Sequence, residues 1–333
     1  MSLSFKHREL LIVNGYVLLV LVLGALLAPA LFFAAQHFIT ASPQGWLAGV
    51  LGEKEFPSYF NRAVLLAALV GMPSLLKTLH MPWKEIVGQI PLGRGARQFT
   101  GTFVLALLSV GVLAWVCLSF GVSRLKPEPP YTDFVGDLIS GLTVGVLEEF
   151  MFRGAILGVL CHSLGVRAGL FWTTLFFSIL HFLKPPLDGA LPNDQVTWLS
   201  GFWVITQLFR GFGLWQNVVG EFMVLAAVGW SLGRLRLASG GLWYSIGLHA
   251  GWVFGMKYFS GLVFSTRLLR EDAYSPWLVR NTCRAIVSPV VGIVPLIIIF
   301  LTGALAVWLV SRLQSRAVSV GKTDEKPVAT SAH

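Results

Sequence analysis

The stretch VLEEFMFRG at residues 146–154 places two adjacent carboxylates and a guanidinium inside an apolar run that extends from 134 to 160. Ionised side chains in hydrocarbon cost several kcal/mol, so a trio of them is expected to face the protein interior. On an α-helix Glu149 and Arg153 are i and i+4 and lie on one face, whereas Glu148 points about 100° away. The spacing therefore pairs Glu149 with Arg153 and leaves Glu148 without that partner. The alternative is that all three form one structural salt-bridge cluster between helices.

The composition is that of a membrane protein. Of 333 residues, 55% are hydrophobic and only 12% are charged, with a mean hydropathy of +0.72. A water-facing surface needs far more charge, which excludes a soluble domain. The net charge is +9, but the basic residues are scattered in short segments between apolar runs, as topology signals are, and this argues against nucleic-acid binding. The three cysteines have no metal-ligand spacing and form no disulfide framework.

Apolar runs long enough to span a bilayer predict an all-α, polytopic membrane protein with about eight transmembrane helices. The expected spans are 10–38, 63–79, 100–122, 134–160, 168–183, 218–237, 242–264 and 287–310. The loop after the fifth span contains a further apolar piece at 196–212, whose tryptophans and Arg210 suit a helix that lies at the membrane interface. Contact with membrane lipid is therefore expected.

Loop charges predict the orientation. If the N-terminus is cytoplasmic, the cytoplasmic segments carry most of the basic residues, whereas the alternate loops contain acids such as Glu53, Glu128 and Asp194. The basic residues in question are Lys6, Arg8, Lys84, Arg94, Arg97, Arg167, Arg234, Arg236, Arg312, Arg316, Lys322 and Lys326. The positive-inside rule then puts both termini in the cytoplasm, and the bias in short loops is typical of a prokaryotic plasma membrane. The polar tail at 311–333 is expected to be a disordered cytoplasmic segment.

Two histidines lie inside predicted spans. Glu148 lies about as many residues before the turn near 163–166 as His181 lies after it, so in a helical hairpin the two side chains reach similar depths, about 22 Å from the turn. They can therefore meet. His249, about 15 Å into the seventh span, needs helix tilt or stagger to come level with them.

Three motifs in order resemble the type II CAAX prenyl protease and bacteriocin-processing family of intramembrane proteases, often called CPBP. They are EExxxR (Glu148, Glu149, Arg153), FxxxH (Phe177, His181) and a later histidine, His249, in SGGLWYSIGLHAGW.

The resemblance implies an all-helical membrane endopeptidase in which Glu148 activates water, His181 positions that water and His249 stabilises the oxyanion. Glu149 and Arg153 form the supporting pair, and Phe177 belongs to the second motif. The expected organisation is three N-terminal spans at 1–132, a protease core at 133–264, a loop with the last span at 265–310, and the tail.

The third motif departs from the family pattern. Family members commonly have an asparagine one turn after this histidine, giving HxxxN, and here the position is Val253. Valine cannot donate a hydrogen bond, and loss of one oxyanion donor typically lowers kcat by about 100- to 1000-fold. Ser245, on the same helical face as His249, and Asn217 are candidate replacements.

Several alternatives stay open. Glutamate and histidine are also zinc ligands, so a zinc metalloprotease is an alternative, although no HExxH spacing and no nearby cysteine supports it. A transporter is less well supported, because the chain has no internal repeat. A non-catalytic scaffold or immunity protein on the same fold is credible given Val253. The expected substrate is a membrane-associated protein or peptide, prenylated or not, and the favoured chemistry needs no metal or other cofactor.

Overall fold

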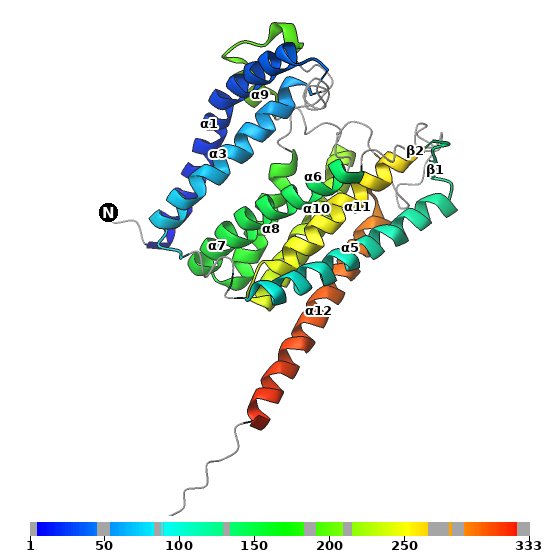
Figure 1. Ribbon diagram of the computed structural model, residues 1–333. Helices are drawn as coiled ribbons and strands as arrows, with labels where there is room; N and C mark the ends of the chain where they lie inside the picture. Colours follow the sequence, from blue (N-terminus) through cyan, green and yellow to red (C-terminus); the bar gives the residue numbers. More distant parts are fainter. Residues whose placement is uncertain are drawn as a thin grey trace, which may run out of the picture.

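The computed structural model describes residues 5–44, 54–82, 88, 90–128, 134–182, 191–208, 215–265, 280–281 and 290–324. Helices make up nearly all of these residues, as expected of an all-α fold (Figure 1). In chain order they are α1 (Phe5–Ala41), α3 (Phe56–Thr78), α5 (Leu92–Ser119), α6 (Phe134–Glu149), a π-helical segment η2 (Phe150–Ile156), α7 (Leu157–Leu164), α8 (Val166–Phe182), the 3₁₀ turn η3 (Asn193–Gln195), α9 (Ser200–Gln207), α10 (Trp215–Ser239), α11 (Trp243–Leu262) and α12 (Ile293–Asp324).

Two short antiparallel pairs interrupt the helical pattern. Strand β1 (Ser123–Leu125) follows α5 and pairs with β2 (Val263–Ser265), which follows α11. Strand β3 (Arg280–Asn281) pairs with β4 (Val290–Val291) just before α12. Hydropathy alone did not predict these strands, because two or three residues are too few to produce a periodic signal.

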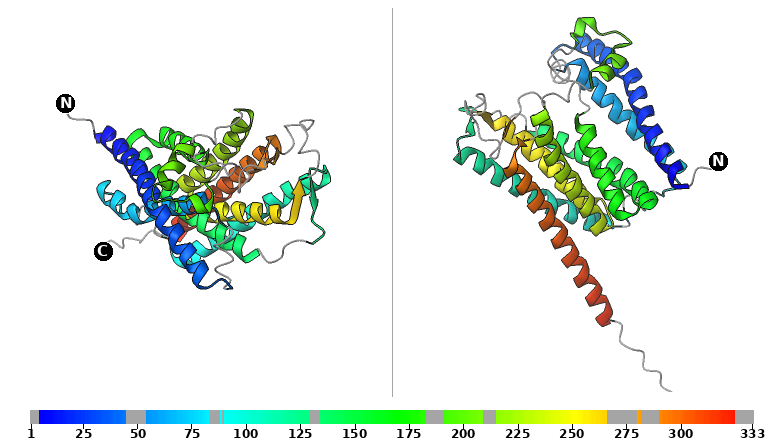
Figure 2. Two further views of the ribbon diagram at one scale, coloured as in Figure 1. Left: turned by 90° about the horizontal axis from the view of Figure 1, so that it is seen from above. Right: turned by 180° about the vertical axis from the view of Figure 1, so that it is seen from behind.

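The helices form two groups. Helices α1 and α3 pack side by side and carry α9 at one end, whereas α5, α6, α8, α10 and α11 form a bundle (Figures 1 and 2). Helix α11 contacts both α5 and α6, and α10 contacts α8 and α12. The predicted interfacial segment contains α9, whose Ser200, Gly201 and Val204 are buried, and the helix packs against α1.

Each of the eight predicted stretches contains a helix, and among the described residues four helices are long and apolar enough to cross a membrane: Leu11–Ala41, Phe56–Thr78, Leu92–Ser119 and Ile293–Ser315. The chain is therefore an integral membrane protein. Apart from α5, the helices of the bundle are shorter or less apolar. Helix α6 ends where the π-helical segment begins, α8 has 17 residues, and α11 carries His249, Lys257 and several glycines. Polar and small residues in these helices lower their mean hydropathy, which is the property that identifies a membrane span.

The expectation of a disordered tail from residue 311 is wrong for its first part. Helix α12 continues to Asp324, and its hydroxyls bond back along the helix, with Ser311 Oγ donating to Val307 O and Ser315 Oγ to Ser311 O. The segment 311–320 lacks proline and glycine and contains good helix formers, so a helix that is already nucleated in the apolar span propagates into it. Residues 325–333 lie outside the described part of the chain.

Glycines set the spacing between α11 and its neighbours. A Cβ added at Gly145 of α6 would lie 2.8 Å from Ala250 Cβ and 2.9 Å from Ala250 N, and one at Gly141 would lie 2.8 Å from Phe254 Cβ. On the other side of α11, a Cβ at Gly251 would lie 2.7 Å from Phe103 O in α5. Small residues allow helix backbones in a membrane to approach closely. Helix α11 is therefore held between α5 and α6 by close backbone contact.

We predict that Gly145→Ala destabilises the protein, because the new methyl group meets the backbone of α11, which cannot rotate away as a side chain can. Gly136→Ala is the matched control in the same helix, since nothing lies within 4 Å of its added Cβ. There, replacing glycine should be neutral or stabilising by up to about 1 kcal/mol. Thermal unfolding in detergent should show a lower melting temperature for Gly145→Ala only. Equal melting temperatures for the two variants would contradict close packing at Gly145.

Candidate active site

A π-helical segment, Phe150–Ile156, lies inside the motif that dominates the sequence. It separates α6, which ends at Glu149, from α7, which begins at Leu157, so the expected continuous helix over 134–160 is interrupted. Short π-helical insertions are rare and frequently occur at functional sites. No residue pattern predicts a π-helical segment, and this one was not expected from the sequence. The segment carries Arg153 into the interior.

The predicted pair of Glu149 and Arg153 is present. Arg153 Nη1 lies 2.8 Å from Glu149 Oε1, and both side chains are fully buried. Arg153 Nη2 donates a second hydrogen bond, 3.2 Å long, to the Gly229 carbonyl of α10. The guanidinium lies over the Phe177 ring, 4.5 Å from its centroid. The charge is thus bound by one carboxylate, one helix carbonyl and one aromatic face, which together offset much of the cost of burying it.

His249 joins this pair from α11. Its Nδ1 lies 2.9 Å from Glu149 Oε1, the same oxygen that accepts from Arg153. A carboxylate paired with arginine is ionised and only accepts, so Nδ1 of His249 is the protonated nitrogen. The opposite nitrogen, Nε2, lies 3.9 Å from Glu148 Oε2. Glu149 therefore fixes both the tautomer and the orientation of this ring.

His181 approaches Glu148 from α8, as the depth argument for the helical hairpin predicted. The turn that makes this possible is Gly165, whose φ of 85° favours glycine, between α7 and α8. His181 Nδ1 lies 2.8 Å from the Phe177 carbonyl, which can only accept, so Nδ1 carries the proton here too. Nε2 of His181 lies 3.6 Å from Glu148 Oε2.

The side chains of the two glutamates differ in solvent exposure. The side chain of Glu148 is 18% exposed, as is that of His181, whereas that of Glu149 is fully buried. Both imidazoles present Nε2 to the same oxygen of Glu148. Separations of 3.6 and 3.9 Å exceed the length of a direct hydrogen bond. The two glutamates thus differ both in exposure and in the groups that they contact.

Val253, at the position of the usual asparagine, is partly buried one turn after His249. The suggestion that Ser245 replaces the missing donor is not supported, because its hydroxyl is fully buried and donates to the Leu242 carbonyl at 3.0 Å. The side chain of Asn217 lies outside the described part of the structure.

A second polar contact between α6 and α11 was not predicted from the sequence. Lys257 Nζ donates to Ser140 Oγ at 2.9 Å and lies 3.8 Å from Asp137 Oδ1. The signal was available, since Lys257 is a charged residue inside the predicted span 242–264 and such residues are functional candidates by default. The carbonyl of Gly229 was also missed, and no sequence pattern identifies a helix carbonyl that accepts from arginine.

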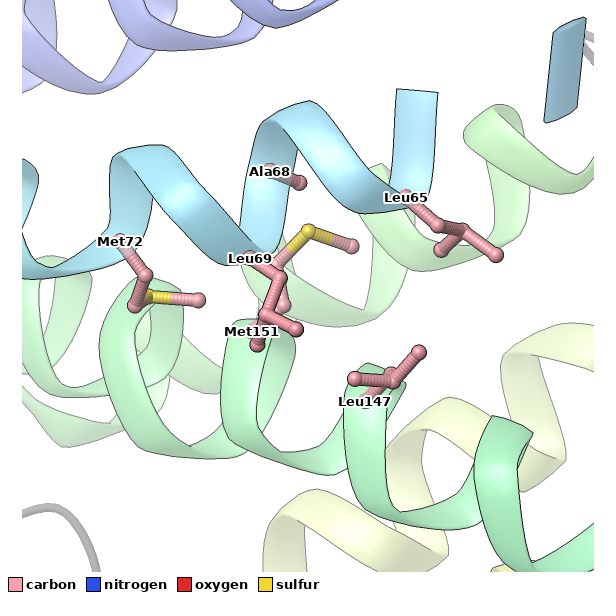
Figure 3. Close-up of a pocket in the computed structure, with 6 residues that line it drawn as sticks. All are labelled: Leu65, Ala68, Leu69, Met72, Leu147 and Met151. Carbon is pink, nitrogen blue, oxygen red and sulfur yellow. The ribbon is translucent and has the colours of Figure 1, made fainter. Parts of the chain in front are cut away.

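An apolar pocket lies beside the motif, between α3 and the junction of α6 with η2 (Figure 3). Leu147, which precedes Glu148, and Met151 line it from one side, and residues of α3 line it from the other. The α3 residues are Leu65, Ala68, Leu69 and Met72.

The glutamates and histidines of the motifs are also potential zinc ligands. Over the described ranges, no group of three or more His, Cys, Asp or Glu residues is arranged to hold a metal ion. Two imidazoles whose Nδ1 atoms are both held by acceptors do match the second-shell pattern of zinc sites.

Comparison with known families agrees with the motifs. The family model described as "Type II CAAX prenyl endopeptidase Rce1-like" matches residues 131–255. No curated protein and no solved structure matches the chain. The matched segment contains the diglutamate motif, Arg153, Phe177 and both histidines, and it ends two residues before Lys257. The family implies a protease that acts on membrane-associated proteins. Residues 131–255 are thus similar to the Rce1-like type II CAAX prenyl endopeptidases, as the three motifs predicted.

Proposed function

We propose that the protein is an intramembrane endopeptidase in which Glu148 activates water. One observation carries the proposal: the more accessible glutamate is the one to which both histidines present Nε2, at 3.6 and 3.9 Å. Its neighbour Glu149 is engaged by Arg153 and His249.

The tautomer of His181, which carries its proton on Nδ1, suits the proposed role in positioning water. A water molecule between Glu148 and His181 donates one O–H to the carboxylate and the other to the unprotonated Nε2 of His181. This leaves a lone pair of the water oxygen for attack on a peptide carbonyl. As the C–O bond forms, the water proton passes to Glu148. Glu148 then delivers it to the leaving amine nitrogen as the C–N bond breaks. Glu148 thus acts first as base and then as acid.

His249 stabilises the oxyanion in this scheme. Its Nδ1–H is held by Glu149, so donation through Nε2 requires the doubly protonated ring. An imidazolium at His249 makes the cluster electrically neutral, because Arg153 and His249 then balance Glu148 and Glu149. Charge assistance strengthens the remaining donor. This compensates in part for the donor that Val253 does not provide.

We propose a membrane-associated protein or peptide as the substrate, prenylated or not. The side chains beside the diglutamate are apolar: Leu147, which directly precedes Glu148, and Met151 face residues of α3 (Figure 3). Such surroundings suit a substrate that reaches the site from the membrane.

We further propose eight spans with both termini on the cytoplasmic side of a prokaryotic plasma membrane. The basic helix ends gather on one side of the structure, which supports this topology. Glu9 near the start of α1 accepts a hydrogen bond from Ser163 at the end of α7. A Cβ on Gly95, near the start of α5, would touch Trp243 at the start of α11.

Replacing the base tests the chemistry. We predict that Glu148→Gln abolishes cleavage and leaves the melting temperature unchanged or higher, because a partly desolvated charge is removed. The assay follows cleavage of an S-farnesylated peptide and its unmodified counterpart by mass spectrometry. A scaffold or immunity protein on this fold would leave both peptides intact with the wild type as well. Continued cleavage by Glu148→Gln would show that Glu148 is not the base.

Replacing Glu149, the supporting carboxylate, tests whether the two glutamates have different roles. Glu149→Ala leaves a buried guanidinium unpaired and should cost about 3 to 5 kcal/mol. The double change Glu149→Ala with Arg153→Met should recover part of this, because methionine packs against the neighbouring phenylalanine rings and leaves no unmatched charge. Thermal unfolding in detergent, with Glu148→Gln as the control, measures both. A greater loss of stability in Glu148→Gln would reverse the assignment.

Chelation separates the metal-free reaction from the zinc alternative. We expect cleavage to survive EDTA and phenanthroline and no stoichiometric zinc to copurify. Inactivation by chelator, with recovery when Zn²⁺ is added back, would instead favour a metalloprotease in which Glu148, His181 and His249 are ligands.

A further inference from the structure

Helices α5 and α12, neither of which contributes to the catalytic cluster, pack against each other. Leu113 of α5 lies in a cluster with Ile298 near the start of α12, and Leu105 packs against the buried cluster that contains Ala306 of α12. Residue numbers therefore fall along α5 as they rise along α12, so the two helices run antiparallel. Both helices are long and apolar enough to cross a membrane.

A stripe of exposed residues follows this contact on α5. Gly101 lies four residues before Leu105 and Leu108 lies three residues after it, so both flank Leu105 on one side of the helix. Both are exposed, and nothing lies within 4 Å of a Cβ added at Gly101. One turn before Gly101, the stripe ends in the exposed Arg97. The apolar surface of α5 beside α12 thus carries a positive charge at one end.

A matching stripe lies on α12. Leu305 and Arg312 follow Ile298 at intervals of seven residues, which keeps them on the side of the helix that faces α5. Both are exposed, and the Arg312 guanidinium lies over the Trp308 ring, 5.4 Å from its centroid. This stripe therefore also ends in an arginine.

The two arginines lie at about the same level of the helix pair. Arg97 precedes Leu105 by eight residues. Arg312 follows Ala306 by six residues, so along antiparallel helices the two guanidinium groups differ in height by only about 5 Å. Neither α5 nor the segment 293–315 of α12 contains an acidic residue. Within the described part of the chain, neither guanidinium makes a hydrogen bond or ion pair with the protein.

We propose that the α5–α12 seam, defined by Arg97, Gly101, Leu108, Leu305 and Arg312, binds an anionic phospholipid of the membrane. A guanidinium presents a fork of N–H donors that matches a phosphate, and here two of them hold one phosphodiester from two helices. The acyl chains lie along the leucines, and Gly101 leaves room for the glycerol backbone next to the phosphate. A soluble phosphate has no acyl chains, so the apolar stripes favour the lipid. The inference does not depend on the proposed peptidase.

Arginines at helix ends also orient a membrane protein during its insertion. That role needs only positive charge and gives Gly101 no function, whereas a lipid site uses Gly101 as well. The test titrates the detergent-solubilised protein with phosphatidylglycerol or phosphatidylcholine of identical acyl chains and counts bound lipid by native mass spectrometry. We expect phosphatidylglycerol to bind about 25-fold more tightly, since each arginine contributes about 5-fold. Arg97→Gln and Arg312→Gln should each lower that affinity about 5-fold and leave the affinity for phosphatidylcholine unchanged. Gly101→Leu should lower the affinity for phosphatidylglycerol without lowering the melting temperature.

Two variants are matched controls and should change neither affinity. Arg124→Gln alters an exposed arginine of β1, beyond the opposite end of α5, and Gly111→Leu alters another glycine of α5 whose added Cβ has nothing within 4 Å. Equal affinities of the wild type for the two lipids, unchanged binding in the arginine variants or in Gly101→Leu, or equal losses in the controls would overturn the proposal. Binding of sn-glycerol 3-phosphate as tightly as the lipid would also overturn it, because the site would then take a soluble phosphate.

Discussion

The central constraint is a single oxygen atom, Oε1 of Glu149, which accepts from both Arg153 and His249 inside the membrane-embedded bundle. Two polar groups are satisfied there by one acceptor, and the same arginine reaches the Gly229 carbonyl and the Phe177 ring. The cluster thus draws together α6, η2, α8, α10 and α11. A buried charge without partners is strongly destabilising, so these helices must keep their register for the ions to be tolerated.

Close helix packing makes this arrangement possible. Gly145 lets the α6 backbone approach Ala250, the residue after His249, so the imidazole arrives within hydrogen-bond distance of Glu149. The π-helical segment that begins at Phe150 then carries Arg153 back against the same carboxylate. Backbone geometry fixes Glu149, and the adjacent Glu148 is left on the partly exposed side.

The sequence predicted what depends on local spacing. Charges in an apolar run indicated an interior cluster, the i, i+4 relation gave the pair of Glu149 and Arg153, and helix rise brought Glu148 level with His181. It did not reveal the π-helical segment or the Gly229 carbonyl, because these depend on tertiary fit rather than residue type. The continuation of α12 past residue 311 was missed because a polar composition was interpreted as disorder, although helix propagation needs only compatible residues after a formed span.

In the proposed reaction, valine at position 253 leaves stabilisation of the oxyanion to a charged donor. In a site with two oxyanion donors, each can be neutral and the hydrogen bonds share the developing negative charge. Here Val253 donates nothing, and His249 can donate through Nε2 only when it is doubly protonated, because Glu149 holds its Nδ1 proton. Glu149 is then more than a counterion for Arg153. By accepting from Nδ1 it orients the ring of His249, so the buried ion pair and the proposed oxyanion donor form one hydrogen-bonded unit.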